Sequence, residues 1–443
     1  MQPTHVGEDS HLLLYRTPKA RLKEGVPIMV AGTGVRVVDQ TGQSYLDLEA
    51  GMTRPVHIGY GRQEMAQAVY DQICALHYFT PVQWATPPAL QLADVLARLA
   101  PGQISRFLFV CDGSEAVEAA LKLARHYHVF RGDATRAKVL VRRGSYHGTT
   151  GGALRAMGLV LPMRHIMEPL APGMVFVESP YCYRCPVHLT YPACEIACAR
   201  DIERVIEFED PAQISAFLGE PIQQGFGAYA PPPEYWPIIK ALCEKYGILL
   251  ILDEVICGFG RTGTWFGADH FGVAPDLITM AKGLSSGYIP LGGVGVTDAV
   301  QAPIEILQHI HTYGNHPVAC AAALKNLEII EREQLVQHAA AMGRYFLEQL
   351  GPLERHPIVG AVRGTGLWLA IELTSRKATR APFPEEGLAR FVARARQQGL
   401  LIRNAGSAIE LAPPLIIQRE EIDEGVRILD ACITAEVRTM GSQ

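Results

Sequence analysis

The segment 247–255, GILLILDEV, constrains the fold more than any other part of the chain. It is apolar until it ends in two acidic residues, Asp253 and Glu254. A strand that is apolar along its whole length is typical of a parallel strand covered on both faces. In open α/β sheets, ligands bind beyond the carboxyl ends of such strands. The segment therefore predicts a buried parallel sheet with a reactive site near Asp253.

Strand-like and helix-like patterns alternate on both sides of this segment, as expected for a doubly wound α/β domain. The region 35–48 resembles two short strands around a turn at 39–42. Further strands are expected at 106–111, 138–143 and 214–221, and helices at 62–76, 88–100 and 114–127.

The length of 443 residues exceeds what one hydrophobic core usually serves. After about residue 325 the pattern changes, and a long helix leads into shorter strands such as 367–373 and a final helix. We expect residues 61–325 to form a large domain and residues 326–443 a small α+β domain. The segment 1–60 should join the small domain in space.

The composition of the chain argues against two kinds of binding partner. The chain is 48% apolar and its net charge is -5, so nothing suggests binding to nucleic acid or to an anionic membrane. The first thirty residues lack the apolar core of a signal peptide. No stretch approaches the roughly 20 apolar residues that a membrane span needs. We expect a cytoplasmic protein with no nucleic-acid or membrane partner.

Gly113 and Ser114 lie where a strand is expected to end and a helix to begin. The free N–H groups and the positive end of a helix dipole suit a phosphate at such a turn. A serine here also commonly caps its helix and does nothing else. The motif alone leaves both interpretations open.

Asp253 and Lys282 are two ionisable residues that directly follow apolar segments. A buried carboxylate needs a partner, which for Asp253 would be a protonated pyridine nitrogen or the loop that follows. Lys282 follows an apolar run and precedes a glycine-rich loop. Partial burial there would lower the pKa of its amine and make it a nucleophile for an aldehyde, unless it is an ordinary lysine at a strand end.

In combination, these motifs resemble the class III aminotransferases of pyridoxal-phosphate fold type I, the omega-amino-acid and amine transaminase group. The resemblance spans about residues 34–414 and includes YHG at 146–148, EPIQ at 220–223, GFGRTG at 258–263, HTYGNHP at 311–317 and RGTG at 363–366. It implies an α/β fold with a large, mainly parallel, doubly wound sheet and a small α+β domain. It also implies pyridoxal 5'-phosphate as cofactor.

The resemblance assigns catalytic roles to three residues. Lys282 would form the Schiff base and carry the proton, Asp253 would pair with the ring nitrogen, and Tyr146 would stack on the ring. Such enzymes form dimers with active sites at the interface, so we expect a homodimer or a higher oligomer. Further cofactor contacts are expected from Gly113, Ser114, His147, Glu220, Val255 and, across the interface, Thr312.

Arg403 lies where amine transaminases carry a mobile arginine, which would pair with the carboxylate of a keto acid and swing away for an amine donor. An edge arginine at the surface is the alternative. Arg54 stands about where an aromatic residue is common, so it would hold an acid group of the donor or point to solvent. Tyr78, Phe79 and Trp84 are candidates for the walls of the substrate pocket or for core packing.

Relatives acting on ornithine or 4-aminobutyrate usually read Glu-Pro-x-x-Gly-Glu-Gly-Gly, in which the second glutamate gates an arginine. Residues 220–227 read EPIQQGFG and lack that acid. This favours pyruvate as acceptor, with an amine or omega-amino acid as donor. Ping-pong kinetics is expected because the carbonyl product leaves before the keto acid reacts. A racemase, decarboxylase or phospho-lyase of the same fold would use the same cofactor residues.

Four cysteines fall in one short loop with the spacing Cys-x2-Cys-x8-Cys-x3-Cys. Thiolates at such spacing are typical of a structural Zn²⁺ site or a [4Fe-4S] cluster. Four reduced cysteines without a metal are the alternative. The predicted metal ligands are Cys182, Cys185, Cys194 and Cys198.

Overall fold

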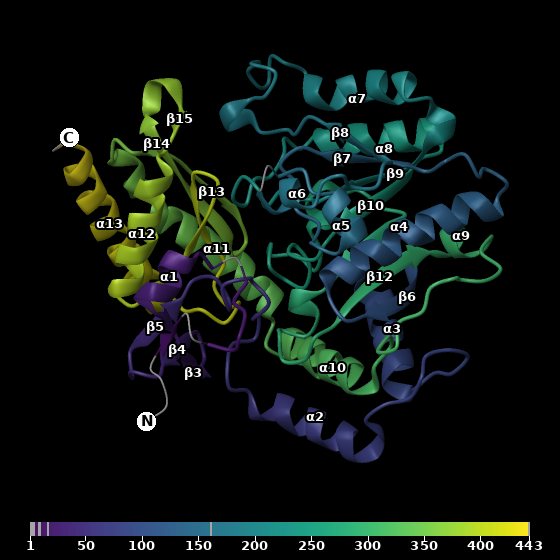
Figure 1. Cartoon of the computed structure of the whole chain (residues 1–443), viewed down its shortest axis with the longest axis horizontal. Helices are drawn as coiled ribbons and strands as arrows, with labels where there is room; N and C mark the ends of the chain where they lie inside the picture. The colour runs from purple at the N-terminus through teal and green to yellow at the C-terminus, as the bar shows by residue number, and fades with distance from the viewer. Residues whose placement is uncertain (1–4, 8–9, 16, 160–161, 442–443) are drawn as a thin grey trace.

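The computed structural model describes residues 5–7, 10–15, 17–159 and 162–441. Its largest element is a seven-stranded sheet in the order β6-β12-β11-β10-β9-β7-β8 (Figure 1). Only β12 runs antiparallel to its neighbours, so the sheet is mainly parallel as predicted. Its strands are β6 Ile104–Val110, β7 Lys138–Arg142, β8 Met174–Val177, β9 Ile214–Gly219, β10 Leu249–Asp253, β11 Leu277–Met280 and β12 Gly292–Thr297.

Strand β10 is buried along its whole length. Its alternate residues enter two separate cores: Leu250 and Leu252 join one, and Leu249 and Ile251 join the other. Helix α8 contributes Trp236 and its neighbours to the first core, and α4 fills the second. Both faces are covered, which explains why the strand carries no polar residue before Asp253.

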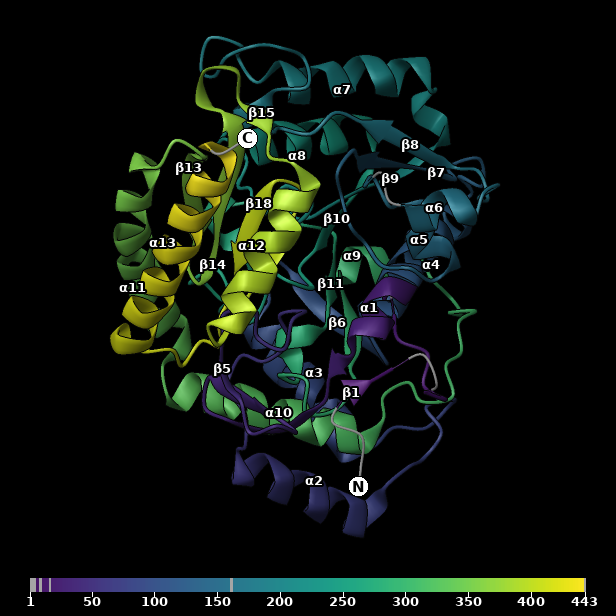
Figure 2. The ribbon, with the colours of Figure 1, turned by 60° about the vertical axis from the view of Figure 1, so that its left-hand side comes forward.

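Two smaller sheets lie to one side of the large one (Figures 1 and 2). One has the order β13-β14-β18-β17, with β15 on β14, and the other has the order β16-β5-β4-β3. Leu46 of β5 pairs in parallel with Leu400 of β16, so the N-terminal strands join the C-terminal part of the chain. This pairing supports the predicted grouping of 1–60 with 326–443, whose boundaries remain a prediction.

The strands of these sheets are β3 Met29–Thr33, β4 Arg36–Asp39, β5 Ser44–Asp47, β13 Val359–Thr365, β14 Trp368–Arg376, β15 Ala381–Pro382, β16 Leu400–Leu401, β17 Arg403–Ala405 and β18 Ala408–Leu411. A separate pair consists of β1 His5–Val6 and β2 Val26–Pro27. The two strands predicted within 35–48 are confirmed as β4 and β5.

The helices are α1 Lys19–Glu24, α2 Gln63–Leu76, α3 Pro87–Leu99, α4 Gly113–Phe130, α5 Gly151–Arg155, α6 Pro162–Ile166, α7 Ala197–Phe208, α8 Tyr235–Tyr246, α9 Asp298–Gln301, α10 Pro317–Arg332, α11 Leu335–Leu350, α12 Glu385–Gln397 and α13 Arg419–Gly441. No helix within the described ranges is long and apolar enough to cross a membrane.

Candidate active site

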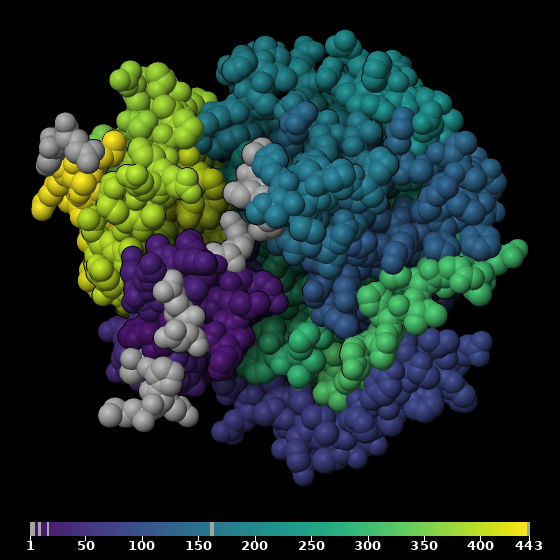
Figure 3. Space-filling view, in the orientation of Figure 1, coloured from purple at the N-terminus to yellow at the C-terminus, as the bar shows by residue number. Residues whose placement is uncertain are grey.

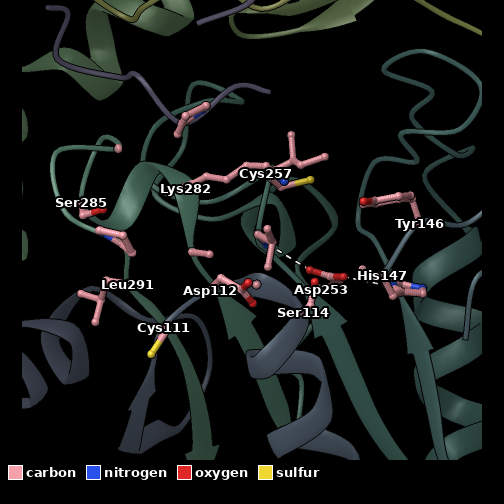
Figure 4. Close-up of a pocket in the computed structure, with 18 of the residues that line it drawn as sticks. Cys111, Asp112, Ser114, Tyr146, His147, Asp253, Cys257, Lys282, Ser285 and Leu291 are labelled. Atoms are coloured by element: carbon pink, nitrogen blue, oxygen red, sulfur yellow. Dashed lines mark hydrogen bonds and ion pairs between the residues drawn. The ribbon is translucent and has the colours of Figure 1, made fainter. Parts of the chain in front are cut away.

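A cavity of about 360 Å³ opens at the carboxyl ends of the central strands (Figure 4). Six segments line it: the region of Pro55, the start of α4, the turn at 146–148, the residues that follow β9, the end of β10 with the residues after it, and the turn after β11. Eight of the nine residues predicted to contact a cofactor lie around this one cavity; Thr312 does not. The eight are Gly113, Ser114, Tyr146, His147, Glu220, Asp253, Val255 and Lys282.

The start of α4 lines the cavity with Gly113 and Ser114, next to Asp112. Asp112, and not Ser114, caps the helix, because its Oδ1 accepts the N–H of Glu115 at 2.8 Å. The expected serine cap is therefore wrong. A side chain at Gly113 would lie 3.0 Å from Val255, so glycine keeps the space between the helix and the end of β10 open.

The turn at 146–148 packs directly on this helix start. Gly148 has a φ of +115°, a left-handed conformation that favours glycine. A Cβ at Gly148 would also lie 2.5 Å from the Ser114 hydroxyl. Close packing of the turn on α4 therefore places Tyr146 and His147 beside the helix N-terminus.

Asp253 is held by three donors at the end of β10. His147 Nδ1 lies 2.7 Å from one carboxylate oxygen, and the Val255 N–H donates to the other at 3.1 Å (Figure 4). Thr279 Oγ1 donates to that second oxygen at 2.9 Å. Asp253 is only 4% exposed. These contacts fix the orientation of the carboxyl group at the edge of the cavity.

Lys282 follows β11 with a φ of +42°, an unusual backbone conformation for a residue other than glycine. Its side chain extends into the cavity (Figure 4). Burial, followed by the positive charge of Arg54, lowers the pKa of its amine to about 8. The lowered pKa expected from the sequence is thus present, and backbone strain of this kind is common at functional sites.

The residue after this lysine has no room for a side chain. A Cβ at Gly283 would lie 2.2 Å from Cε1 of the buried His57 ring, which a hydrogen bond to the Phe259 carbonyl group holds in place. We expect Gly283→Ala to destabilise the protein by about 1–3 kcal/mol through overpacking. The urea midpoint, followed by circular dichroism, measures this effect. Gly151→Ala is the control, since its Cβ meets nothing within 4 Å, and an equal midpoint for the two variants would refute the packing argument.

The two predicted substrate arginines lie beside the cavity without lining it. Arg54 is buried, with Glu410 Oε2 at 2.6 Å and Glu49 Oε2 at 3.5 Å from its Nη1. Arg403 on β17 keeps 28% of its side chain exposed. Both positive charges contribute to the lowered pKa of Lys282, so both lie near its amine. Arg54 does not point to solvent, and two carboxylates already surround it.

Thr312, Tyr78 and Trp84 lie together on the outside of the chain. The Tyr78 hydroxyl donates to the Thr312 carbonyl oxygen at 2.9 Å, and Trp84 is 62% exposed. In Figure 3, the green segment containing Thr312 lies against the dark blue segment that follows α2. None of these residues borders the cavity of their own chain.

Sequence reasoning missed several residues of the site. Thr279 on β11 is the cross-strand partner of Asp253. The pairing register of β10 with β11 would have predicted this contact. The residues after Lys282 form the expected loop as far as Leu291, and β12 then begins at Gly292. Glu49 and Glu410 were also missed, because each comes from a distant part of the chain and nothing local marks either one.

The four loop cysteines surround one small cavity next to the start of α7. All four are free and partly buried. Burial raises the pKa of the Cys182 thiol and raises that of Cys198 to about 12. Within the described part of the chain, no group of three or more His, Cys, Asp or Glu side chains could hold a metal ion. The predicted zinc or iron–sulfur site is therefore not supported.

The fold and the site together define a class of protein. A mainly parallel sheet carries at its carboxyl edge a helix N-terminus, a fixed carboxylate and a lysine of lowered pKa. This combination suits an anionic ring cofactor that bears an aldehyde. Residues 21–433 match the family model described as aminotransferase class III, and the chain belongs to that family.

Individual relatives agree with this assignment. The putrescine–pyruvate aminotransferase of Pseudomonas aeruginosa is 36% identical, over 97% of this chain and 95% of the relative. The diaminobutyrate–2-oxoglutarate transaminase of Halomonas elongata is 39% identical, over 90% of this chain and 88% of the relative. The structure of an amine transaminase from an uncultivated Pseudomonas species in its pyridoxal-phosphate form superposes with a TM-score of 0.92, at 36% identity, over 98% of this chain and all of that one.

Proposed function

We propose that this class III aminotransferase is an omega-transaminase that moves an amino group from an amine or omega-amino acid to pyruvate. The observation that carries the proposal is the single cavity that unites Lys282, Asp253, Tyr146 and the start of α4. The positive charge of Arg403 lies close enough to influence Lys282. A carboxylate acceptor therefore has a partner beside the reacting centre.

The residues present fit pyridoxal 5'-phosphate, the cofactor of this family. When bound, it supplies an electron-withdrawing ring and an aldehyde that accepts the amino group. The start of α4, with Gly113 and Ser114, would hold the phosphate. Tyr146 would cover one face of the ring and Val255 the other, while Asp253 would pair with the ring nitrogen.

Lys282 would act in both halves of the reaction. Its amine would hold the cofactor at rest and, once displaced by the donor, take a proton from the donor carbon that bears nitrogen. The same amine would return the proton in the second half, when a keto acid takes the place of the product. Because the first product leaves before the second substrate binds, the kinetics should be ping-pong.

The pKa of Lys282 predicts how fast the apoprotein captures its cofactor at different pH values. Only the neutral amine attacks an aldehyde, so raising the pH through about 8 should increase the capture rate. Stopped-flow absorbance after mixing apoprotein with pyridoxal phosphate measures the midpoint. For an exposed lysine, the capture rate would have its pH midpoint at about 10.4. Such a midpoint here would contradict the lowered pKa of Lys282.

The acceptor proposal has structural support at Gly225, which occupies the position of the missing gate glutamate. A Cβ at Gly225 would lie 2.0 Å from the Gly144 carbonyl oxygen, so no side chain fits there without rearrangement. Next to it, Phe226 stacks on Tyr181 with ring centroids 4.2 Å apart. Neither residue offers a carboxylate that would gate Arg403 as in the 4-aminobutyrate relatives.

A homodimer would complete the site. Large apolar side chains are exposed on the two segments that carry Tyr78 and Thr312, and such gathering is typical of protein interfaces. We propose that a second copy covers them, which would bring Thr312 to the phosphate of the partner's cofactor. The exposed residues include Tyr70, Ile73, Phe79, Val82, Trp84, Ile306, Ile310 and Tyr313.

Arg403→Gln tests the acceptor proposal. We expect KM for pyruvate to rise about tenfold or more, because a charge-assisted pair to the carboxylate is lost. The half-reaction with putrescine, a donor without a carboxylate, should change less than about twofold. Arg344→Gln, an exposed arginine on α11, is the matched control. Equal losses with pyruvate and with putrescine, or a preference for 2-oxoglutarate over pyruvate, would contradict the proposal.

A further inference from the structure

A cluster of two arginines and two glutamates lies between the N-terminal segment and the sheet that holds β17 and β18. The side chains of Glu49 and Glu410 are fully buried and that of Arg54 is 4% exposed. Arg403, at 28%, is the member of this cluster with access to solvent. Three of the four charged groups are therefore confined, and one can move.

Glu410 is fixed at both carboxylate oxygens. The indole N–H of Trp368 donates to Oε1 at 2.9 Å, and Arg54 Nη1 donates to Oε2 at 2.6 Å. Trp368 is itself fully buried on β14. Because both donors are immobile, the Glu410 carboxylate cannot follow a partner that moves away.

Arg403 rests against this fixed carboxylate through long contacts. It lies directly opposite Glu410 in the antiparallel pairing of β17 with β18. Its Nε is 3.8 Å from the Glu410 oxygen that Arg54 already holds, and its Nη1 donates to the Met52 carbonyl oxygen at 3.3 Å. Long, partly exposed contacts contribute little free energy, so a substrate carboxylate can replace them at small cost.

The balance of charge also favours an incoming anion. Among the described residues, neither oxygen of Glu49 has a hydrogen-bond partner, and burial, followed by the Glu410 charge, raises its pKa to about 8. Glu49 therefore balances the positive charge of the arginines less than an exposed glutamate would. Arg403, the movable member, is the arginine that an incoming anion can reach.

We infer that Glu410 is a positioning residue that holds Arg403 aside and competes with the substrate carboxylate for it, while Arg54 and Trp368 keep Glu410 in place. The inference rests on the proposed role of Arg403 in binding the keto acid. With a donor that lacks a carboxylate, Arg403 stays opposite Glu410. With a keto acid, the 3.8 Å contact is exchanged for a closer pair with the substrate. Glu410, the cross-strand neighbour of Arg403, thus provides a resting contact for this arginine. Gly225, which has no side chain, cannot provide one.

Calorimetric titration of the holoenzyme with propionate, a carboxylate that cannot react, measures this competition. Glu410→Gln should bind propionate about two- to fivefold more tightly, because the competing charge is removed. Glu372→Gln is the matched control, since Glu372 is a buried glutamate on the neighbouring strand β14 that pairs with Arg184 and Arg363. Its affinity for propionate should equal that of the wild type.

A double-mutant cycle separates Arg403 from Arg54. In an Arg403→Gln background, Glu410→Gln should leave propionate binding unchanged. A persistent increase would assign the effect to Arg54 and overturn the inference, as would unchanged or weaker binding in Glu410→Gln alone. If circular dichroism shows that Glu410→Gln does not fold, Glu410→Asp, which withdraws the carboxylate from Arg403, should show the same increase.

The calorimetry is independent of the proposed reaction. A wild-type enzyme that binds propionate as expected but transfers no amino group would refute the proposed function and leave the Glu410 inference standing. A normal transamination with no response of propionate binding to Glu410→Gln would refute the inference alone.

Discussion

Lys282→Ala is expected to lower the turnover number by a factor on the order of 10⁴ or more. The substitution removes the amine that holds the cofactor and also the group that moves the proton. Among the residues that the structure describes, no other lysine lines the cavity, so no neighbour there can replace it. Steady-state turnover with a saturating amine and pyruvate measures the loss.

The cofactor should still bind to this variant without a covalent link. The start of α4, Asp253 and Tyr146 remain, so absorbance should report a free aldehyde in place of the form attached to lysine. Lys245→Ala, a surface lysine on α8 that pairs with Glu203, is the control and should keep full activity. An unchanged cofactor spectrum in Lys282→Ala would show that the reactive amine is elsewhere.

Asp253→Asn is expected to lower turnover by about 10²–10³, since it removes a preorganised charge while keeping the size of the side chain. Three donors surround the carboxylate, and an amide group would face the same donors with its own N–H groups. The charge opposite the ring nitrogen is lost and the hydrogen bonds are disturbed. The main effect of this substitution should therefore be on turnover. Its effect on the thermal unfolding midpoint should be small.

Two measurements separate these effects. Turnover under saturating substrate reports the chemical loss, and the thermal unfolding midpoint reports the structural one. Asp201→Asn, on the exposed face of α7, is the control for loss of a negative charge. Near-normal turnover in a well-folded Asp253→Asn enzyme would contradict the role proposed for the carboxylate.

Local patterns in the sequence predicted the large sheet and most of the cavity. The apolar segment before Asp253 identified a doubly covered strand because both faces of β10 enter a core. Gly113 and Lys282 could be found because each follows a strand of the same sheet, and the ends of parallel strands meet at one edge. Tyr146 was assigned only through the resemblance to the family. Periodicity and strand ends are local signals, and they are visible in a single chain.

Long-range contacts could not be predicted in the same way. Glu410 meets Arg54 across 356 positions in the chain, and no local pattern marks such a pair. The cysteine spacing suggested a metal, yet no group of side chains that could hold a metal ion forms among the described residues. Asp112 replaced Ser114 as the helix cap because backbone direction, which sequence does not reveal, decides which side chain reaches the N–H groups.

One single-turnover experiment tests the central claim most directly. Holoenzyme is mixed with excess putrescine and no keto acid, and both the cofactor absorbance and the carbonyl product are followed. Transamination predicts one equivalent of product per active site, a complete change in the absorbance, and its reversal when pyruvate is added. Continued product formation without an acceptor, or no reversal by any keto acid, would contradict the claim that this enzyme is a transaminase.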